Sequence, residues 1–184
     1  GRAFVRACLV VLALAAILAA ATPTLATTGN TIIYVVPGGT GGGTSWDDGK
    51  DLAAALSGAS SNSELWVKAG TYKPTTGTDR TATFALKSGV AVYGGFAGTE
   101  TTRGRRNWRA NVTILSGDLG GGSRSLHVVT GSGTNDTAVL DGFTITGGNA
   151  NGNYPDSAGG GIYNYQGRPT LTNLIISGNS AWNG

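Results

Sequence analysis

A tryptophan and four arginines lie close together between residues 103 and 109, and these residue types could bind an acidic ligand. Guanidinium groups pair with carboxylates and stack on aromatic rings, so an acidic polysaccharide would fit this set. The alternative is a solvated loop whose tryptophan packs on the flank of a helix, because runs of charge usually face solvent. The candidate ligand-binding residues are Arg103, Arg105, Arg106, Trp108 and Arg109.

The acidic residues could serve as metal ligands or catalytic acids, but they are spread along the chain. Asp118 and Asp141 each stand next to a predicted strand. Calcium needs about six to eight oxygen ligands, usually from several acids, so we expect solvated turn aspartates, no metal site and no cofactor. The adjacent pair Asp47-Asp48 fits helix capping better than the paired carboxylates of an inverting glycosidase.

The single histidine, His127, lies in the run Leu126-His127-Val128-Val129. Alternation along a strand places Leu126 and Val128 on one side and His127 on the other, so we expect a surface histidine. One histidine without a serine motif does not make a catalytic triad. The chain therefore carries no complete catalytic set, which leaves open whether the protein is an enzyme.

Residues 1–26 have the layout of a secretory signal peptide. Arg2 and Arg6 precede an apolar run from Ala7 to Ala21, and Thr24-Leu25-Ala26 supplies a cleavage site. The run is shorter than the roughly 20 residues that a membrane-spanning helix needs. We therefore expect a cleaved leader and a protein that is secreted or held at the cell surface.

The chain without this leader would be free of cysteine and almost neutral. Its only cysteine, Cys8, lies in the leader, so neither disulfides nor a thiolate site is expected. Removal of Arg2 and Arg6 lowers the basic residues from 13 to 11 against 10 acidic residues, and the net charge from +3 to +1. This balance gives no support for nucleic-acid binding.

Short β-prone runs punctuated by glycine predict an all-β protein. Glycine contributes 32 of 184 residues, and it separates runs of β-branched and apolar residues that are typical of strands. A turn is expected at residues 69–71. The predicted strands are residues 31–36, 64–68, 81–86, 90–93, 112–115, 126–130, 138–145, 162–165 and 171–176.

One helix is expected before most of these strands. Leu52, Ala55, Leu56 and Ala59 recur at helical spacing and form one apolar stripe. Asp47 or Asp48 is expected to accept the free N–H groups of the first turn, and Gly58 with the serines after it ends the helix.

An internal repeat defines the architecture. Residues 140–147 align with residues 171–178 at an offset of 31, so that Leu140 matches Leu171 and Ile145 matches Ile176. A period between about 20 and 50 residues indicates a solenoid, in which each unit buries its apolar side by stacking on the next.

The corners and ends of such a solenoid account for other features of the sequence. Gly and Asn, among them Asn173, suit tight bends between faces, and the excess length of the repeat is expected to bulge at residues 149–157. The helix would cover the open N-terminal end. We expect a signal peptide at 1–26, a strand and capping helix at 27–63, and the first coils of a C-terminally truncated β-helix at 64–184.

Three segments resemble bacterial secreted proteins of the pectin-lyase-like superfamily: Leu65 to Tyr72, Val92 to Phe96 and Gly159 to Asn164. The last of them, with residues 171–173 and 177–181, is also similar to the repeats of polymorphic outer-membrane proteins. The resemblance covers about residues 31–184 and implies a right-handed parallel β-helix with an N-terminal capping helix. The superfamily includes lyases, polygalacturonases, adhesins and tailspikes, so the resemblance selects no function.

The function expected from these features is that of an exported or cell-surface β-helix scaffold that is adhesive or contacts an extracellular polysaccharide or a host or cell surface. The alternative is a polysaccharide lyase or glycoside hydrolase whose active site lies beyond residue 184, and only a lyase would use calcium. A third hypothesis is an autotransporter-like passenger segment. Contact with a membrane is expected only through the signal peptide or a C-terminal anchor.

Overall fold

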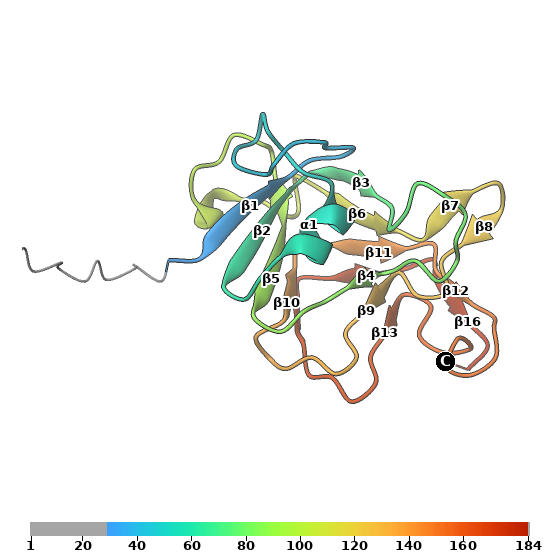
Figure 1. The fold of residues 1–184 in the computed structure, drawn as a ribbon. Coiled ribbons are helices and arrows are strands. Elements are labelled where there is room, and N and C mark those ends of the chain that lie inside the picture. The colour runs from blue at the N-terminus through green and yellow to red at the C-terminus, as the bar shows by residue number, and fades with distance from the viewer. Residues whose placement is uncertain (1–28, 184) are drawn as a thin grey trace, which may run out of the picture.

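The structure is a computed structural model that describes residues 29–183, so the predicted signal peptide lies outside the described residues. This part of the chain is all-β, with strands that pair mainly in parallel (Figure 1). Its helices are α1 (Leu52–Gly58) and the short 3-10 helix η1 (Arg103–Arg105). Neither helix has the length and apolar character that crossing a bilayer requires.

Four parallel sheets and one hairpin contain the strands. The first sheet joins β1 (Thr31–Val35), β2 (Ser63–Lys68), β5 (Val90–Phe96), β10 (Val139–Asp141) and β14 (Thr170–Thr172) in this order. The second joins β3 (Gly70–Tyr72), β6 (Thr113–Ser116), β11 (Thr144–Thr146) and β15 (Ile175–Ile176). The third joins β4 (Phe84–Ala85), β9 (Val129–Thr130) and β13 (Ile162–Tyr163), and the fourth joins β12 (Asn149–Ala150) and β16 (Ser180–Ala181). The antiparallel hairpin is β7 (Asp118–Gly120) with β8 (Ser123–Arg124).

The chain visits these sheets in turn and then returns to the first. It passes from β2 to β3 and β4, then from β5 to β6 and β9, then from β10 through β11 and β12 to β13. Each strand pairs in parallel with the corresponding strand of the next passage. This order is compatible with a β-solenoid in which each passage is one coil.

The 31-residue repeat is confirmed as the strand register between the last two coils. Leu140 lies opposite Leu171, Ile145 opposite Ile176, and Ala150 opposite Ala181. Alternate residues of each strand point inward, so Leu140 and Ile145 are almost fully buried. The predicted bulge begins two residues later than expected, because Asn149 and Ala150 belong to β12.

Corner residues divide two runs that the sequence predicts as single strands. The predicted strand 138–145 is interrupted at Gly142, with φ +89°, and the predicted strand 171–176 at Asn173, with φ +51°. Both angles lie in the left-handed region, which ends a strand and turns the chain. The turn expected at 69–71 is shorter than predicted: the chain bends at Ala69, between the end of β2 and the start of β3 at Gly70.

The helix begins at a different acid from the two that the sequence suggested. The side chain of Asp51 accepts hydrogen bonds from the backbone N–H groups of Ala53 and Ala54. Asp48 instead closes its own loop, where it accepts hydrogen bonds from the backbone of Gly42 and from Thr44. Leu52, Ala55 and Leu56 of α1 are buried in the core, where the helix contacts β1, β2 and β4.

The last coil exposes the residue row that earlier coils bury. Leu140 is 1% exposed, whereas Leu171 at the matching position is 38% exposed; Ile145 is 0% exposed and Ile176 54%. Within the described residues, the inward side chains of β10 and β11 are therefore covered by neighbouring coils, whereas those of β14 and β15 are left partly exposed.

This difference predicts unequal costs for the same substitution. Leu140→Ala should lower the free energy of unfolding by about 3 kcal/mol, because it leaves a cavity in a packed core. Leu171→Ala, its matched control one coil later, should cost less than about 1 kcal/mol, because less apolar surface is lost from the core. Urea unfolding followed by circular dichroism measures both. Equal costs would contradict the burial difference.

Candidate functional site

The predicted ligand-binding residues lie on residues 97–112, which connect β5 to β6 and are called the arginine loop here. Glu100 anchors its first turn. The Glu100 carboxylate accepts hydrogen bonds from the backbone N–H groups of Ala97, Gly98 and Thr99, and its carbonyl oxygen accepts one from Trp46 Nε1 at 3.0 Å. These bonds fix the start of the loop to the aromatic side chains beside β1.

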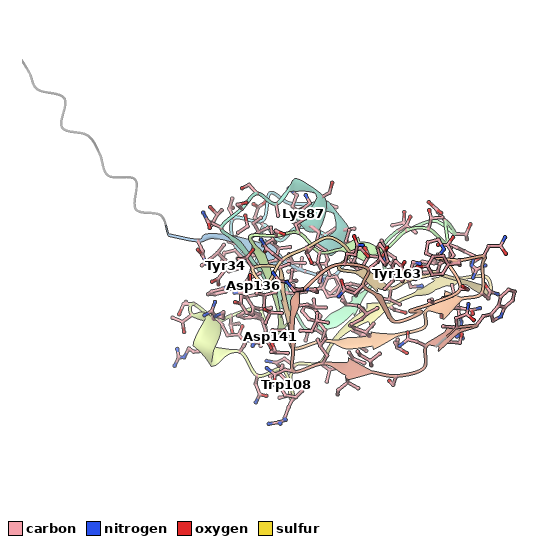
Figure 2. All side chains as sticks on the ribbon, turned by 90° about the horizontal axis from the view of Figure 1, so that it is seen from below. Tyr34, Lys87, Trp108, Asp136, Asp141 and Tyr163 are labelled. Atoms are coloured by element: carbon pink, nitrogen blue, oxygen red, sulfur yellow. The ribbon has the colours of Figure 1, made fainter. Side chains whose placement is uncertain are left out.

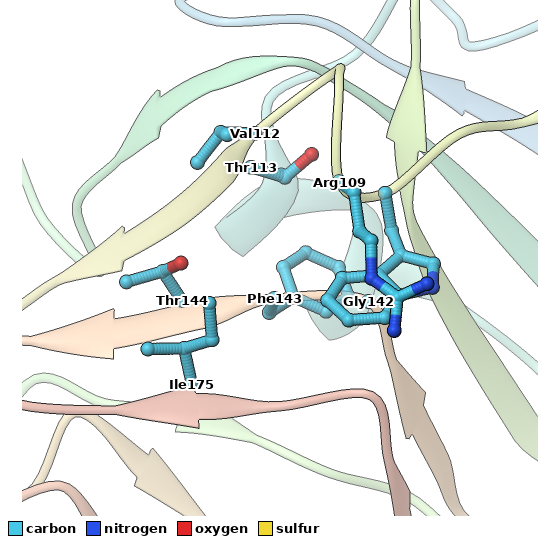
Figure 3. A pocket seen from close by; sticks show the side chains of 8 residues that line it. Arg109, Val112, Thr113, Gly142, Phe143, Thr144 and Ile175 are labelled. Carbon is cyan, nitrogen blue, oxygen red and sulfur yellow. The ribbon is translucent and has the colours of Figure 1, made fainter.

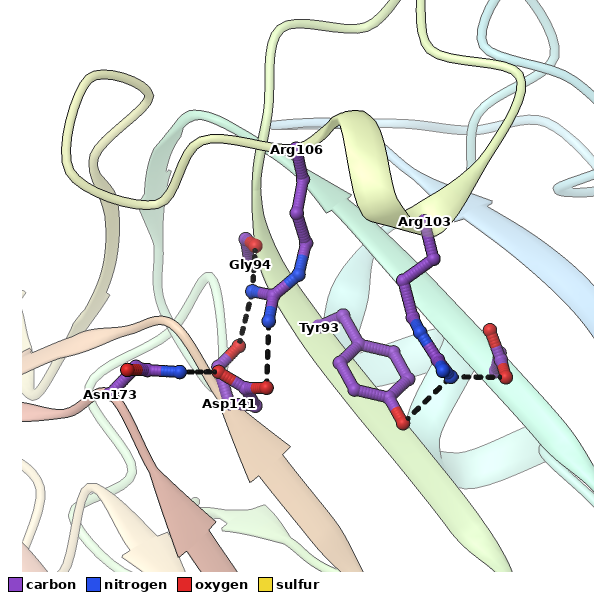
Figure 4. Close-up of polar contacts among 7 residues, drawn as sticks. Tyr93, Gly94, Arg103, Arg106, Asp141 and Asn173 are labelled. Carbon is purple, nitrogen blue, oxygen red and sulfur yellow. Dashed lines mark hydrogen bonds and ion pairs between the residues drawn. The ribbon is translucent and has the colours of Figure 1, made fainter.

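Arg103 binds the outer face of the first sheet. Its Nη1 lies 2.7 Å from Glu64 Oε1 on β2, and the same nitrogen donates to the Tyr93 hydroxyl at 3.0 Å (Figure 4). The guanidinium carbon also lies 4.6 Å from the centre of the Tyr93 ring. Burial raises the pKa of Tyr93, and the Arg103 cation opposes that rise. Glu64 is further bound by Trp66 Nε1 and Asn30 Nδ2, so its buried charge is well compensated.

Arg106 makes the more deeply buried contact. Its Nη2 lies 2.7 Å from Asp141 Oδ2, its Nη1 donates to the Gly94 carbonyl at 2.8 Å, and the two paired side chains are 13% and 14% exposed (Figure 4). Asn173 of the next coil donates to the other oxygen of Asp141 at 2.8 Å. Asp141 was expected to be a solvated turn aspartate; instead it is the acceptor that holds the arginine loop.

The other members of the cluster face outward. Trp108 lies on Gly95 and Gly142 of the first sheet, where a Cβ atom at residue 95 would come within 2.5 Å of the Trp108 Cα. Arg109 stacks over the Trp108 ring at 4.6 Å. Among residues 29–183, ion pairs occupy Arg103 and Arg106, whereas Arg105 and Arg109 are exposed without one. Trp108 therefore packs on the sheet and not on the helix.

A pocket of about 320 Å³ opens beside Trp108 and Arg109 (Figure 3). Figure 2 shows Trp108 and Asp141 in one region of the molecule and Tyr163 in another. The pocket lies between the arginine loop and the outer faces of the second sheet. Its lining residues are Trp108, Arg109, Val112, Thr113, Gly142, Phe143, Thr144 and Ile175.

A second pocket of about 250 Å³ lies between α1 and β4. Lys87 at its edge donates its Nζ to the Ser57 carbonyl at 2.6 Å. That bond ties its charge to the backbone, so the pocket presents little to a polar ligand.

His127 is more enclosed than the sequence suggested. Its side chain is 12% exposed, because residues 151–159 fold over it. Its Nδ1 lies 3.1 Å from the Gly159 carbonyl oxygen, its Nε2 lies 3.4 Å from Asp156 Oδ1, and its ring stacks on Tyr163 at 4.7 Å. Both ring nitrogens face oxygen atoms of the protein, which suits a role in holding the 151–159 loop.

The remaining acids match no metal site. Asp118 is exposed and accepts the backbone N–H of Gly120, as a turn aspartate does. No group of three His, Cys, Asp or Glu side chains within the described chain is arranged to hold a metal ion.

Comparison of the chain with models of protein families, with curated proteins and with solved structures gives no match. The described residues form an all-β protein of mainly parallel sheets.

The two kinds of arginine should differ in their effect on stability. Arg106→Gln should lower the free energy of unfolding by about 3 kcal/mol, because it leaves the carboxylate of Asp141 buried without its partner. Arg109→Gln should change it by less than about 0.5 kcal/mol, since this side chain is exposed. Urea unfolding of both variants measures this. A double variant Arg106→Gln/Asp141→Asn should recover part of the loss, and no recovery would argue against the pair.

Acid should weaken the anchor at Glu100. Burial disfavours the Glu100 carboxylate, but the N–H donors of residues 97–99 outweigh burial and lower its pKa below the ordinary value of 4.5. The unfolded chain therefore binds this proton more tightly than the folded chain does. The stabilising contribution of Glu100 is present above pH 4.5 and is lost as the pH falls through the lowered pKa.

Glu100→Gln should consequently lower the melting temperature at neutral pH, and its difference from wild type should shrink on acidification through this window. Thermal unfolding at a series of pH values measures the difference. A difference that is constant with pH would exclude this role for Glu100.

Proposed function

We propose that this chain forms coils of a right-handed parallel β-helix that is exported or held at the cell surface, and that its outer wall binds an acidic polysaccharide. The return of the chain to each sheet in the same order supports the coiled architecture, and so does the resemblance of three segments to pectin-lyase-like proteins. The leader pattern of residues 1–26 supports export.

The observation that carries the binding role is the exposure of Arg105 and Arg109 on the arginine loop, with Arg109 stacked over Trp108 at 4.6 Å. The charges of Arg103 and Arg106 are neutralised by Glu64 and Asp141. The positive charge that remains on the arginine loop therefore belongs to the exposed side chains of Arg105 and Arg109, and the second of these stacks on an indole ring. Guanidinium groups bind carboxylates in a bidentate manner, and an indole ring offers an apolar face for stacking.

The wall beside the loop suits an extended polymer. Successive parallel strands lie about 4.8 Å apart, so each coil presents its outward side chains in a row beside those of the next. Thr144 and Thr146 of β11 point outward in the second sheet. Thr144 lies between Ile114 and Ile175 of the flanking coils, and Thr146 lies opposite Ser116. A chain of sugars can contact several coils at once, which multiplies weak contacts.

A binding role is also supported by how the candidate catalytic groups are used. Asp141 is paired with Arg106, and His127 directs both ring nitrogens to oxygen atoms of its own chain. A catalytic base needs a position from which it can reach a substrate proton. These two residues are instead arranged to fix loops.

Binding should depend on the exposed arginines of the loop. Arg105→Gln and Arg109→Gln should each weaken binding to polygalacturonate by about fivefold, the size expected for an exposed ion pair. The effect should diminish with added salt, which screens exposed charges. Affinity gel electrophoresis measures this, with neutral dextran as the control polymer.

Arg124→Gln is the matched control protein, because Arg124 is exposed on the β7–β8 hairpin, far from the arginine loop (Figure 1). It should bind polygalacturonate as the wild type does. Equal loss in all three variants would show that overall charge, and not this loop, governs retention. Equal retention by dextran would remove the acidic class of ligand.

A further inference from the structure

The pocket beside Trp108 has a lining that differs from what a sugar requires. Its walls include the indole of Trp108 and the apolar side chains of Val112, Phe143 and Ile175. The Thr113 hydroxyl accepts the Gly95 N–H at 2.9 Å and is already engaged. This leaves the hydroxyl of Thr144, the guanidinium of Arg109 and the indole N–H of Trp108 as the polar side-chain groups of the lining. A sugar ring presents several hydroxyl groups, each of which needs a partner when it is buried.

An apolar ring needs no such partners, and the volume suits one. Ligand pockets range from about 300 to 1,000 Å³, and this one has about 320 Å³. An aromatic ring placed here would lie among Val112, Phe143 and Ile175, which Figure 3 labels around the pocket, and beside Trp108, which also lines it. Offset or edge-on contacts with the indole would add to the burial of its surface.

The charge at the mouth of the pocket selects the rest of the ligand. Arg109 is held over the Trp108 ring at 4.6 Å, and it lines the pocket without an ion-pair partner among residues 29–183. Stacking restricts the guanidinium before any ligand arrives, so less freedom is lost on binding. A planar guanidinium matches a carboxylate with two parallel hydrogen bonds.

We infer that this pocket binds an aromatic carboxylate, with the ring among Trp108, Val112, Phe143 and Ile175 and the carboxylate on Arg109. The inference goes beyond the proposed function, although Arg109, Trp108, Thr144 and Ile175 take part in both. The apolar side chains of the lining favour an aromatic ring, and the guanidinium of Arg109 favours a carboxylate.

The seat of the pocket is rigid enough to hold such a ligand. The backbone N–H of Asn107 and the side chain of Asn111 both donate to the Gly95 carbonyl, at 2.8 and 3.1 Å. Trp108 lies directly on Gly95 and Gly142, whose lack of a side chain permits this close approach. The backbone and Cβ of Trp108, from which the indole projects, are therefore positioned by the strands beneath them.

Equilibrium dialysis and saturation-transfer NMR with three small probes test the inference on the whole chain. The probes are 2-naphthoate, the neutral 2-naphthalenemethanol of the same shape, and monomeric galacturonate. The naphthoate should bind about tenfold more tightly than the alcohol, the effect expected of a hydrogen bond to a charged group, and galacturonate should not bind measurably. Equal binding of naphthoate and the alcohol would overturn the role of Arg109.

Variants locate the binding. Arg109→Gln should reduce naphthoate affinity to that of the alcohol, and Thr144→Trp should abolish naphthoate binding by filling the pocket. Thr146→Trp, an outward residue on the same strand outside the pocket lining, is the matched control and should bind normally. Ile175→Ser should weaken binding severalfold, which keeps the test open if Thr144→Trp fails to fold. Unchanged naphthoate binding in both Thr144→Trp and Ile175→Ser would show that the ligand does not bind in this pocket.

The same variants separate this inference from the polysaccharide proposal. Arg105→Gln should weaken polygalacturonate binding and leave naphthoate binding unchanged, because Arg105 does not line the pocket. If the wild-type protein binds polygalacturonate but not naphthoate, the pocket inference is wrong and the polysaccharide proposal stands. If it binds naphthoate but not polygalacturonate, the polysaccharide proposal is wrong and the pocket inference stands.

Discussion

In-register parallel stacking is the constraint on which the rest of this structure depends. Strands of successive coils lie about 4.8 Å apart, so each inward residue must pack directly on those of the neighbouring coils. The column Ile33, Leu65, Val92, Leu140 and Leu171 runs through the first sheet in this way. A shift of one residue would turn every inward side chain outward. Large variation in length therefore falls at the corners, and within the first sheet the register of β2 and β5 shifts by one residue only near their carboxyl ends, between Trp66 and Lys68.

The arginine loop is such a corner. Between β10 and β11 the chain turns through Gly142 and Phe143, whereas between β5 and β6 the equivalent corner contains residues 97–112. A loop of this length on the outer wall covers buried groups on the sheet, and Glu64 on β2 and Asp141 on β10 supply the charges that it needs. The two acids lie on different coils, so the loop also ties together strands that are not neighbours in the first sheet.

The local pattern of the sequence predicted the fold well and the roles of individual polar residues poorly. The repeat gave the register of Leu140 and Leu171 because apolar periodicity records which residues face inward. The division of Ala138–Ile145 at Gly142 was missed because a strand run does not reveal which glycine adopts a positive φ. The partner of Asp141 was missed because Arg106 is 35 residues away, and no local pattern encodes a contact made through the turn of a coil. His127 was misjudged for the same reason: its cover, residues 151–159, comes from the next coil.

Arginines of one short segment thus acquire two roles from what the sheet offers beneath them. Arg103 and Arg106 form ion pairs with carboxylates of the first sheet and hold the loop in place. Arg105 and Arg109 form no ion pair among the described residues, so their charges can bind a ligand. The two roles depend on each other. An exposed guanidinium on a freely moving loop would lose much conformational freedom on binding a ligand, and that loss would offset the contact. Because Arg106 is locked to Asp141 and Trp108 to two glycines, Arg109 is presented from a fixed base. The ion pairs of Arg103 and Arg106 therefore contribute to recognition through the order that they impose, although they touch no ligand themselves.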